Sequence, residues 1–397
     1  MKEIVIHDTE ETRTIALLED TNLVEYYEET KEKKILDGNI YCGIVRNILP
    51  GMQSAFVDIG ENKNAFIHIK DVIPKVSDTT GNKCETISKY NISDYMKQRM
   101  KILVQVKKEE EHQKGAKISS NINLPGRYTI IMPESNFITV SQKIEDKKEI
   151  ERLKKIISRS LNGIKENYGV IVRTCAEGID EKELENDVNK LIILWKNILK
   201  EFNNAKEYDE PSLIYESPDI AQKLIIGTAK QKECKIYVNT KKLEEMAKNV
   251  LNGFNIKDVN VELKKEGLLD LYDLSEQIES AKQRKVWLKS GAFITIDRTE
   301  ALTAIDVNSG KFVGKKDNSK NDTIYNVNRE ATIEIAKQLR LKNISGIIIV
   351  DYIDMEEESE RSGILDLLEK ELKKDRSKTQ IMGFTKLDLL ELTRKKI

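Results

Sequence analysis

Apolar and polar residues alternate in short runs along the first third of the chain. Residues 3–28 show this two-residue period between turn residues, which predicts a short antiparallel meander. Residues 38–72 and 100–110 add about five more short strands separated by glycine and asparagine turns, a spacing typical of a small barrel. The pattern therefore predicts an inserted β-module over residues 36–118.

From about residue 119 the apolar residues recur at spacings of three and four. Residues 149–161 and 181–202 are predicted to form amphipathic helices, whereas residues 127–133 and 168–174 are predicted strands. This α/β segment ends near residue 215.

A strand, a helix and a second strand then follow at "CKIYVNT", "KKLEEMAKNVL" and "DVNVELKK". They indicate a βαβ-like unit that ends near residue 265. On strand count alone, this unit is a candidate to complete the sheet begun by the N-terminal meander.

The last third of the chain has the clearest pattern. A strand at residues 300–308 leads through a polar loop to a helix whose apolar residues share one face, namely Ile324, Val327, Ala331, Ile335 and Leu339. The uninterrupted apolar run in "GIIIVDYID" predicts a strand buried on both faces beneath helices. A helix at "SGILDLLEKELKKD", a strand at "TQIMGF" and a final helix at "KLDLLELTRKK" complete a predicted α/β layered domain over residues 281–397.

Composition narrows the class of protein. A chain of 397 residues with 39% hydrophobic residues is long enough for two to four domains. Its 66 Lys and Arg nearly cancel its 67 Asp and Glu, so any nucleic-acid site must come from local patches. The charged N-terminus excludes a secretory signal, and no apolar run reaches about 18 residues, so we expect a cytoplasmic protein. The cysteines have no paired spacing, which favours bystander thiols at Cys42, Cys84, Cys175 and Cys234.

Carboxylates end two of the most apolar predicted strands. Asp306 and Asn308 lie two residues apart, so they face the same side of one strand, and Asp351 ends another. Ligands gather at the carboxyl ends of such strands, and two carboxylates brought together there favour a cation between them. Mg²⁺ is suited to such a site because it is often held by one or two carboxylates. An Asp at a strand end is also a common helix cap, and Asp354 competes with Asp351 for the role.

The candidate nucleophile is water. All three histidines lie outside the predicted C-terminal domain, and no nucleophile elbow, Walker loop or zinc-binding H-E-x-x-H motif is present. Hydrolysis at these carboxylates would therefore need metal-activated water.

The β-module carries aromatic residues on consecutive strands. Phe56 lies in "SAFVDIG", Phe66 lies in "NAFIHI", and Lys114 follows in "HQKGAK". Exposed aromatic rings on a barrel of this kind stack on unpaired bases, and a lysine contacts the phosphate backbone. The alternative is that both phenylalanines are core residues.

Taken together, "TEALTAIDVNSG", "AKQLRLKNISGIIIVDYIDM", "SAFVDIG" and "VIVRT" resemble the ribonuclease E/G family of bacterial endoribonucleases. The resemblance covers nearly the whole chain and implies a multidomain α/β and α+β fold. It implies two parts of a ribonuclease H-like subdomain around an inserted OB-fold barrel and a 5′-sensor subdomain, followed by a deoxyribonuclease I-like catalytic α/β subdomain. The corresponding ranges, in chain order with the ribonuclease H-like parts first and fourth, are 1–35, 36–118, 119–215, 216–280 and 281–397.

The resemblance also implies roles for individual residues. The family's catalytic Asp, Asn and Asp fall on Asp306, Asn308 and Asp351, with both aspartates as Mg²⁺ ligands, and this match selects Asp351 over Asp354. The RNA-binding contacts of the barrel fall on Phe56, Phe66 and Lys114. A pocket for a 5′-monophosphate falls on Gly126, Ile130, Arg173 and Thr174, although an arginine at a strand end can equally be a solvated side chain.

The implied activity is Mg²⁺-dependent endonucleolytic hydrolysis of single-stranded RNA, with a preference for 5′-monophosphorylated substrates, in rRNA processing and mRNA decay. Two rival functions are a non-catalytic RNA-binding protein and a metal-dependent phosphoesterase acting on DNA. Where family members often carry two arginines after the first sensor strand, this chain has Gln142 and Lys143. The chain stops at Ile397, before the family's cysteine pair that shares zinc between protomers, so a homodimer or homotetramer stays open and no zinc link is inferred.

Overall fold

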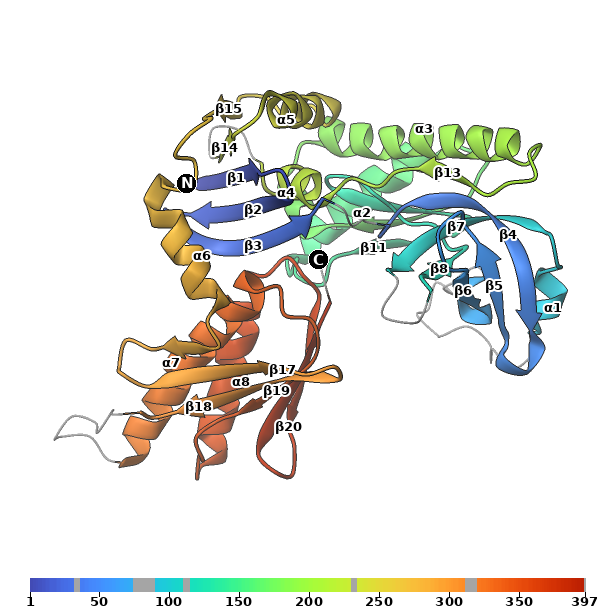
Figure 1. The fold of residues 1–397 in the computed structure, drawn as a ribbon. Helices are drawn as coiled ribbons and strands as arrows, with labels where there is room; N and C mark the ends of the chain where they lie inside the picture. Colours follow the sequence, from blue (N-terminus) through green and yellow to red (C-terminus); the bar gives the residue numbers. More distant parts are fainter. Residues whose placement is uncertain (32–35, 74–89, 110–114, 230–233, 311–319, 396–397) are drawn as a thin grey trace. The chain divides into compact units, whose positions relative to one another are not determined.

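The computed structural model describes residues 1–31, 36–73, 90–109, 115–229, 234–310 and 320–395 (Figure 1). These residues fall into two compact units, of which the first combines Met1–Lys33 with Ile220–Ile397 and the second comprises Lys34–Asp219. Each unit contains both helices and sheets, so the expectation of a mixed α/β fold is confirmed. The assignment of five named subdomains stays a prediction.

The first unit contains a five-stranded sheet with the strand order β15-β14-β1-β2-β3. Its three N-terminal strands form the predicted antiparallel meander, and β14 pairs in parallel with β1, with Ile4 opposite Ile236. The expectation that the later βαβ unit completes the N-terminal sheet is therefore confirmed. The strands are β1 (Lys2–Asp8), β2 (Thr12–Glu19), β3 (Asn22–Thr30), β14 (Cys234–Val238) and β15 (Asn260–Leu263), and the helices beside them are α4 (Ile220–Thr228), α5 (Lys241–Gly253) and α6 (Leu274–Lys282).

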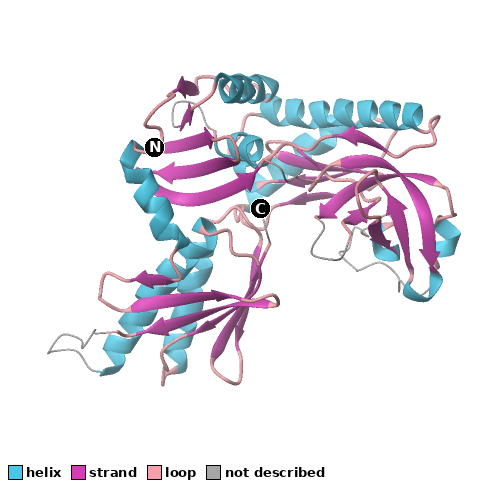
Figure 2. Ribbon diagram, viewed as in Figure 1, coloured by secondary structure: helices cyan, strands magenta, loops and turns pink. Residues whose placement is uncertain are grey.

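The C-terminal part of the same unit is a six-stranded sheet with the order β16-β17-β18-β19-β21-β20, in which only β18 and β19 are parallel. Two helices lie along one face of this sheet (Figure 2). The buried apolar stripe of the first helix, which includes Val327, Ala331, Ile335 and Leu339, packs in the core beneath the sheet. The elements are β16 (Lys285–Trp287), β17 (Phe293–Arg298), β18 (Leu302–Asn308), α7 (Lys320–Leu341), β19 (Gly346–Asp351), α8 (Glu358–Leu372), β20 (Thr379–Phe384) and β21 (Leu389–Arg394).

Two details of the predicted C-terminal domain are wrong. Strand β19 is not buried on both faces, because Ile347 is 52% exposed while Ile348 is buried. The predicted final helix is strand β21, which pairs with β19 and β20. The leucines of this segment fit both a helical and a two-residue period, and pairing with β19 selects the period that buries Leu390 and Leu392.

The second unit begins with a closed barrel. Five strands are paired in the order β4-β5-β6-β8-β7, and a further pairing between β4 and β7 closes the ring. Ala55, Val57, Ala65 and Ile67 point inward to the apolar core, which confirms that the inserted β-module is a barrel. The elements are β4 (Ile40–Leu49), β5 (Ser54–Asp58), β6 (Ala65–His68), α1 (Ile92–Tyr95), β7 (Lys101–Lys108) and β8 (Lys117–Ser119), with β13 (Ser212–Tyr215) added beside β4.

The rest of the second unit is a four-stranded sheet with the order β11-β12-β10-β9, packed with two amphipathic helices. Each helix begins at an aspartate, Asp146 or Asp180, whose side chain accepts a hydrogen bond from a backbone N–H of the first turn. The elements are β9 (Leu124–Pro125), β10 (Thr129–Pro133), β11 (Ile138–Val140), α2 (Lys147–Leu161), β12 (Tyr168–Val172) and α3 (Glu181–Ala205). None of the helices in the described ranges is both long and apolar enough to cross a bilayer.

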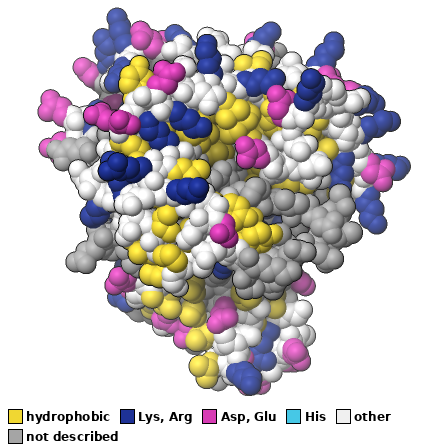
Figure 3. All heavy atoms as spheres, turned by 90° about the vertical axis from the view of Figure 1, so that its right-hand side faces the viewer, with side chains coloured by type: hydrophobic (Ala, Val, Ile, Leu, Met, Phe, Trp, Pro, Cys, Tyr) yellow, Lys and Arg dark blue, Asp and Glu magenta, His cyan; other side chains and the backbone are white. Residues whose placement is uncertain are grey.

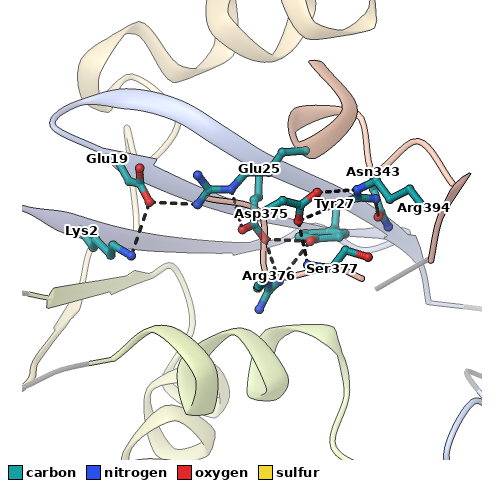
Figure 4. Close-up of polar contacts among 10 residues, drawn as sticks. Lys2, Glu19, Glu25, Tyr27, Asn343, Asp375, Arg376, Ser377 and Arg394 are labelled. Carbon is teal, nitrogen blue, oxygen red and sulfur yellow. Dashed lines mark hydrogen bonds and ion pairs between the residues drawn. The ribbon is translucent and has the colours of Figure 1, made fainter. Parts of the chain in front are cut away.

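A buried cluster of charges joins the N-terminal sheet to the C-terminal part of the first unit (Figure 4). Glu25 on β3 is 1% exposed and accepts hydrogen bonds or ion pairs from Arg340 of α7 at 3.1 Å and from Arg376 at 2.7 Å. The Tyr27 hydroxyl donates to the same carboxylate at 2.8 Å, and Arg340 also pairs with Glu19 at 2.9 Å. We call these five residues the Glu25 cluster.

Candidate active site

The two predicted aspartates face each other across neighbouring strands. Strands β18 and β19 are parallel, and Asp306 is the register partner of Asp351. On β18 the side chains of Thr303, Ile305 and Val307 are buried, so Asp306 is directed to the opposite, open face of the sheet. Asp351 is likewise exposed at the end of β19. The structure therefore brings together two carboxylates that are 45 residues apart in sequence, by the difference of their numbers.

Asn308 lies on the same open face, two residues after Asp306. Its side-chain amide donates a hydrogen bond of 2.5 Å to a carboxylate oxygen of Asp306. The strand ends at Asn308. Two residues later, Gly310 has a φ of +59° and approaches the carbonyl oxygen of Gly291 so closely that a Cβ there would lie 2.6 Å from it. We call Asp306, Asn308 and Asp351 the carboxylate row.

Negative charges lie close together at the carboxylate row. The pKa of Asp351 is raised above its ordinary value because the group is partly desolvated and because Asp306 and Asp354 place negative charge near it. Asp354, the competing candidate, is therefore close enough to contribute charge. Within the described ranges, no group of three or more His, Cys, Asp or Glu side chains could hold a metal ion. The candidate ligands at the row are the two carboxylates of Asp306 and Asp351. That ligand set fits Mg²⁺, which keeps most of its water and binds substrate phosphate, better than a metal that needs a full protein cage.

A polar contact beneath the sheet fixes the backbone after Asp351. Asn328 of α7 is fully buried, its amide donates to the carbonyl oxygen of Ile353 at 2.8 Å, and its own oxygen accepts from the Ile353 N–H at 3.2 Å. Thr332, one turn later, contacts the Tyr352 hydroxyl at 2.9 Å. The sequence reasoning missed both residues, although polar residues four apart on an apolar helix stripe were a visible signal.

On the barrel, the two predicted phenylalanines lie on one outer surface. Phe56 and Phe66 are register partners on β5 and β6, both half-buried, with ring centres 6.0 Å apart in an edge-to-face arrangement. Lys114 lies outside the described residues. A lysine that the sequence reasoning missed, Lys117, is the register partner of Phe66 on β8; it is half-exposed and pairs with Asp71 at 3.2 Å.

On one face of the molecule, charged side chains of both signs are mixed. On the face drawn in Figure 3, Lys and Arg side chains are interspersed with acidic and apolar ones. This dispersal matches the near-zero net charge of the sequence. Binding of a polyanion to such a surface would depend on particular contacts more than on a general field.

The predicted 5′-phosphate residues gather at one end of the four-stranded sheet. Arg173 follows β12, and its guanidinium donates to the carbonyl oxygen of Gly126 at 2.9 Å. The Thr174 hydroxyl is exposed and lies 2.9 Å from the hydroxyl of Ser141. Ile130 on β10 pairs in register with Ile171 of β12 and is half-buried. The structure therefore brings Arg173 to Gly126, and Thr174 to the strand end that precedes Gln142 and Lys143.

Buried Asp187 of α3 shapes the turn that contains Gly126. Its carboxylate accepts hydrogen bonds from the backbone N–H groups of Arg127, Tyr128 and Thr129 at 2.9–3.0 Å and from the Thr129 hydroxyl at 2.8 Å. A Cβ at position 126 would lie 2.7 Å from the same carboxylate, so the turn requires glycine there. The sequence reasoning missed Asp187, for which an acidic residue within the apolar stripe of a helix was the available signal.

Comparisons with known proteins show the family to which the chain belongs. The model of the Ribonuclease E/G family matches residues 123–397. The chain is 37% identical to "Ribonuclease G" of Escherichia coli over 99% of its own length and 80% of that protein, and 38% identical to "Ribonuclease G" of Haemophilus influenzae over 99% and 79%. The chain is also 33% identical to "Ribonuclease E" of Nostoc, over 100% of its own length and 56% of that protein. The chain therefore belongs to the Ribonuclease E/G family.

Proposed function

We propose that this protein is a Mg²⁺-dependent endoribonuclease that cuts single-stranded RNA and prefers substrates with a 5′-monophosphate. The endoribonuclease class follows from the family, and it confirms the expectation from the sequence. The metal ion, the substrate preference and the residue roles are our proposal. The observation that carries the metal ion and the catalytic roles is the pairing of Asp306 with Asp351 on the open face of the sheet.

In this proposal Asp306 and Asp351 hold the ion, and the phosphodiester lies over the open face beside them. A bound Mg²⁺ would activate water and neutralise charge on the phosphate oxygens. Asn308 fixes one oxygen of Asp306 through its 2.5 Å hydrogen bond, so the carboxylate keeps one orientation. Asn328 acts from beneath as a positioning residue, because it fixes the backbone two residues after Asp351. Cleavage would leave a 5′-phosphate and a 3′-hydroxyl.

The other two surfaces would hold the RNA. Phe56 and Phe66 present half-buried rings on the outside of the barrel, where an unpaired base can stack. Lys114 would contact the phosphate backbone. We call Gly126, Ile130, Arg173 and Thr174 the sensor surface. Its Arg173 offers a fork of donors to a terminal phosphate, and only one of them is used for the Gly126 carbonyl among the described contacts. Thr174 adds a hydroxyl, while Gly126 and Ile130 shape the wall.

The test is to map cut sites on an RNA oligonucleotide carrying either a 5′-monophosphate or a 5′-hydroxyl, with Mg²⁺ or with a chelator, and on DNA of the same sequence. We expect cuts only in RNA with Mg²⁺, and faster cleavage of the monophosphorylated strand. The Arg173→Gln variant should lose that preference, whereas Arg159→Gln, an exposed arginine of the same unit, should keep it. Equal cleavage of DNA, or cleavage without a divalent ion, would overturn the proposal.

The biological setting that we propose is the one named for the family, rRNA processing and mRNA decay. We also propose that the protein forms a homodimer or homotetramer. Sedimentation of the purified chain measures this directly.

A further inference from the structure

An exposed aromatic pair lies on the open face of the C-terminal sheet. Trp287 of β16 is 61% exposed, and its ring contacts that of Phe293 on β17 edge-to-face, with centres 5.2 Å apart. The Lys285 ammonium lies 3.9 Å from the centre of the Trp287 ring and 3.6 Å from that of Phe293. We call Lys285, Trp287 and Phe293 the aromatic platform. None of the motifs that identify the site accounts for it.

The platform is continuous with the carboxylate row in the register of the sheet. Trp287 pairs with Phe293, and Phe293 pairs with Asn308. In the next row, Lys285 pairs with Thr295, which pairs with Asp306. Strands in a sheet are about 4.8 Å apart, so Trp287 lies about 10 Å across the face from Asn308. The turn at Gly310 also approaches the Phe293 ring, since a Cβ there would lie 3.4 Å from it.

The chemistry of the platform fits one kind of occupant. A large, exposed ring provides a surface on which any unpaired base can stack, and a neighbouring ammonium provides a charge for the adjoining phosphate. A tryptophan that served only the core would be buried, whereas Val286 between Lys285 and Trp287 is the residue of β16 that packs on the core. The charge and the register therefore both point toward a nucleotide that extends from the carboxylate row.

We propose that the aromatic platform is a base-binding subsite, in which Trp287 stacks on an unpaired base next to the scissile phosphate and Lys285 contacts its backbone. This proposal rests on the proposed function for the position of the scissile phosphate. It adds a substrate contact within the C-terminal sheet itself, separate from the barrel and from the sensor surface. The competing occupant of an exposed tryptophan on an edge strand is a second copy of this chain, which the experiments below distinguish.

The first experiment uses the fluorescence of Trp287. The chain has two tryptophans, and the other, Trp195, is buried in α3, so Trp195→Phe leaves Trp287 as the only tryptophan. The variant is titrated in chelator, which prevents cleavage, with a short single-stranded RNA and with a matched strand of abasic ribose phosphates. We expect saturable quenching by the intact RNA alone. Binding of intact RNA, followed by anisotropy, without a change in Trp287 emission would overturn the subsite.

The second experiment locates the stacked base. A series of RNA substrates carries one abasic residue at each position around the cut. An abasic residue at one of these positions should slow cleavage by the wild-type enzyme about tenfold, which is the effect of losing one stacked base. Trp287→Ala should be about tenfold slower on intact RNA and insensitive to that abasic position, while Trp287→Phe should recover part of the rate. Met382→Ala, which alters another exposed apolar residue of the same sheet, should behave as wild type.

The third variant separates charge from stacking. Lys285→Met keeps an aliphatic chain near the rings but removes the charge. It should therefore weaken the binding of intact and abasic RNA equally, and it should reduce the slope of log affinity against log salt concentration by about one. If the abasic profile of Trp287→Ala equals that of wild type, or if the variant only changes the sedimenting mass, the subsite proposal fails while the proposed function stands. If no RNA is cut at all, the proposed function fails and the fluorescence titration still decides the subsite.

Discussion

The first unit contains two clusters of acidic side chains that differ in how their charge is balanced. In the Glu25 cluster the carboxylate is 1% exposed, and two arginines and a tyrosine surround it (Figure 4). In the carboxylate row Asp306 and Asp351 are exposed and adjacent, and Asp306 and Asp354 both place negative charge near Asp351. The charge of Glu25 is balanced by arginines of the chain, whereas the charges of Asp306 and Asp351 repel each other.

In our proposal this difference separates charges that stabilise the fold from charges that serve catalysis. Burying Glu25 requires partners, because an unpaired buried charge costs several kcal/mol, and the chain supplies Arg340 and Arg376. Repulsion between Asp306 and Asp351 is tolerated at the surface, where water screens it, and the Mg²⁺ ion that we propose would relieve it. Disrupting each cluster should therefore affect a different property, stability in one case and turnover in the other.

The largest expected effect is on turnover. Asp306→Asn should lower the rate of RNA cleavage at saturating substrate by at least about 100-fold. The reason is that one of the two carboxylates proposed to bind the ion becomes a neutral amide. RNA binding and thermal stability should stay near wild type, as measured by anisotropy and calorimetry. Glu391→Gln removes an exposed carboxylate of the neighbouring strand β21 and should leave the rate unchanged. Retained cleavage by Asp306→Asn would remove the row from the mechanism.

The second effect is on stability. Glu25→Ala leaves Arg340 and Arg376 without their shared partner, so the free energy of unfolding should fall by about 3 kcal/mol. Denaturant unfolding measures this loss, and the turnover of the remaining folded enzyme should match wild type. The control is Glu28→Gln, an exposed glutamate of the same strand. A normal unfolding midpoint for Glu25→Ala would show that the cluster contributes little.

A smaller effect is expected from the ion itself. Mg²⁺ at a few times its dissociation constant should stabilise the wild type by about 1 kcal/mol in thermal unfolding, and Asp351→Asn should lose this gain. Without Mg²⁺, the stability difference between Asp351→Asn and the wild type should have the opposite sign at neutral pH. Because the pKa of Asp351 is raised in the folded state, its ionisation opposes folding, so Asp351→Asn should be the more stable protein. That difference should vanish in acid, where Asp351 is protonated in both states.

The smallest expected effect is on the stability contributed by Glu149, whose charge is paired with Arg152. Glu149 accepts from Arg152 at 2.7 Å and from the Gly178 N–H at 2.8 Å, and its pKa is lowered from 4.5 to about 2, chiefly by the Arg152 hydrogen bonds. Its stabilisation is therefore complete above the ordinary pKa and lost as the pH falls toward 2. Glu149→Gln should cost about 1 kcal/mol at pH 7 and nothing near pH 2. Equal losses at both pH values would mean that packing, not charge, is responsible.

The geometry of the carboxylate row was accessible from the sequence because it depends on local rules. Asp306 and Asn308 share a face through the two-residue period, and strand ends meet at one edge of a sheet. Asp351 could be placed beside them once its strand was assumed to be a neighbour. The same local rules failed for residues 389–394, where leucines fit two periods and only pairing with β19 decides.

The supporting contacts were not accessible for a different reason. Glu25 and Arg340 lie 315 residues apart, and the sequence around either residue does not predict its contact with the other. Asn328 and Asp187 were visible as polar residues in apolar helix stripes, but the backbone groups they bind come from distant loops. The open face of the sheet was missed because an uninterrupted apolar run cannot report which side is covered.

The pairing of β1 with β14 sets an order for folding during synthesis. The N-terminal strand emerges from the ribosome more than 200 residues before its parallel partner, because residues 2–6 pair with residues 234–238. At 5–20 residues per second that interval is roughly 10–50 s, in which β1 presents an unpaired edge while the barrel-containing unit can already close. A nascent chain halted before residue 234 should therefore protect the second unit from protease while leaving the meander accessible.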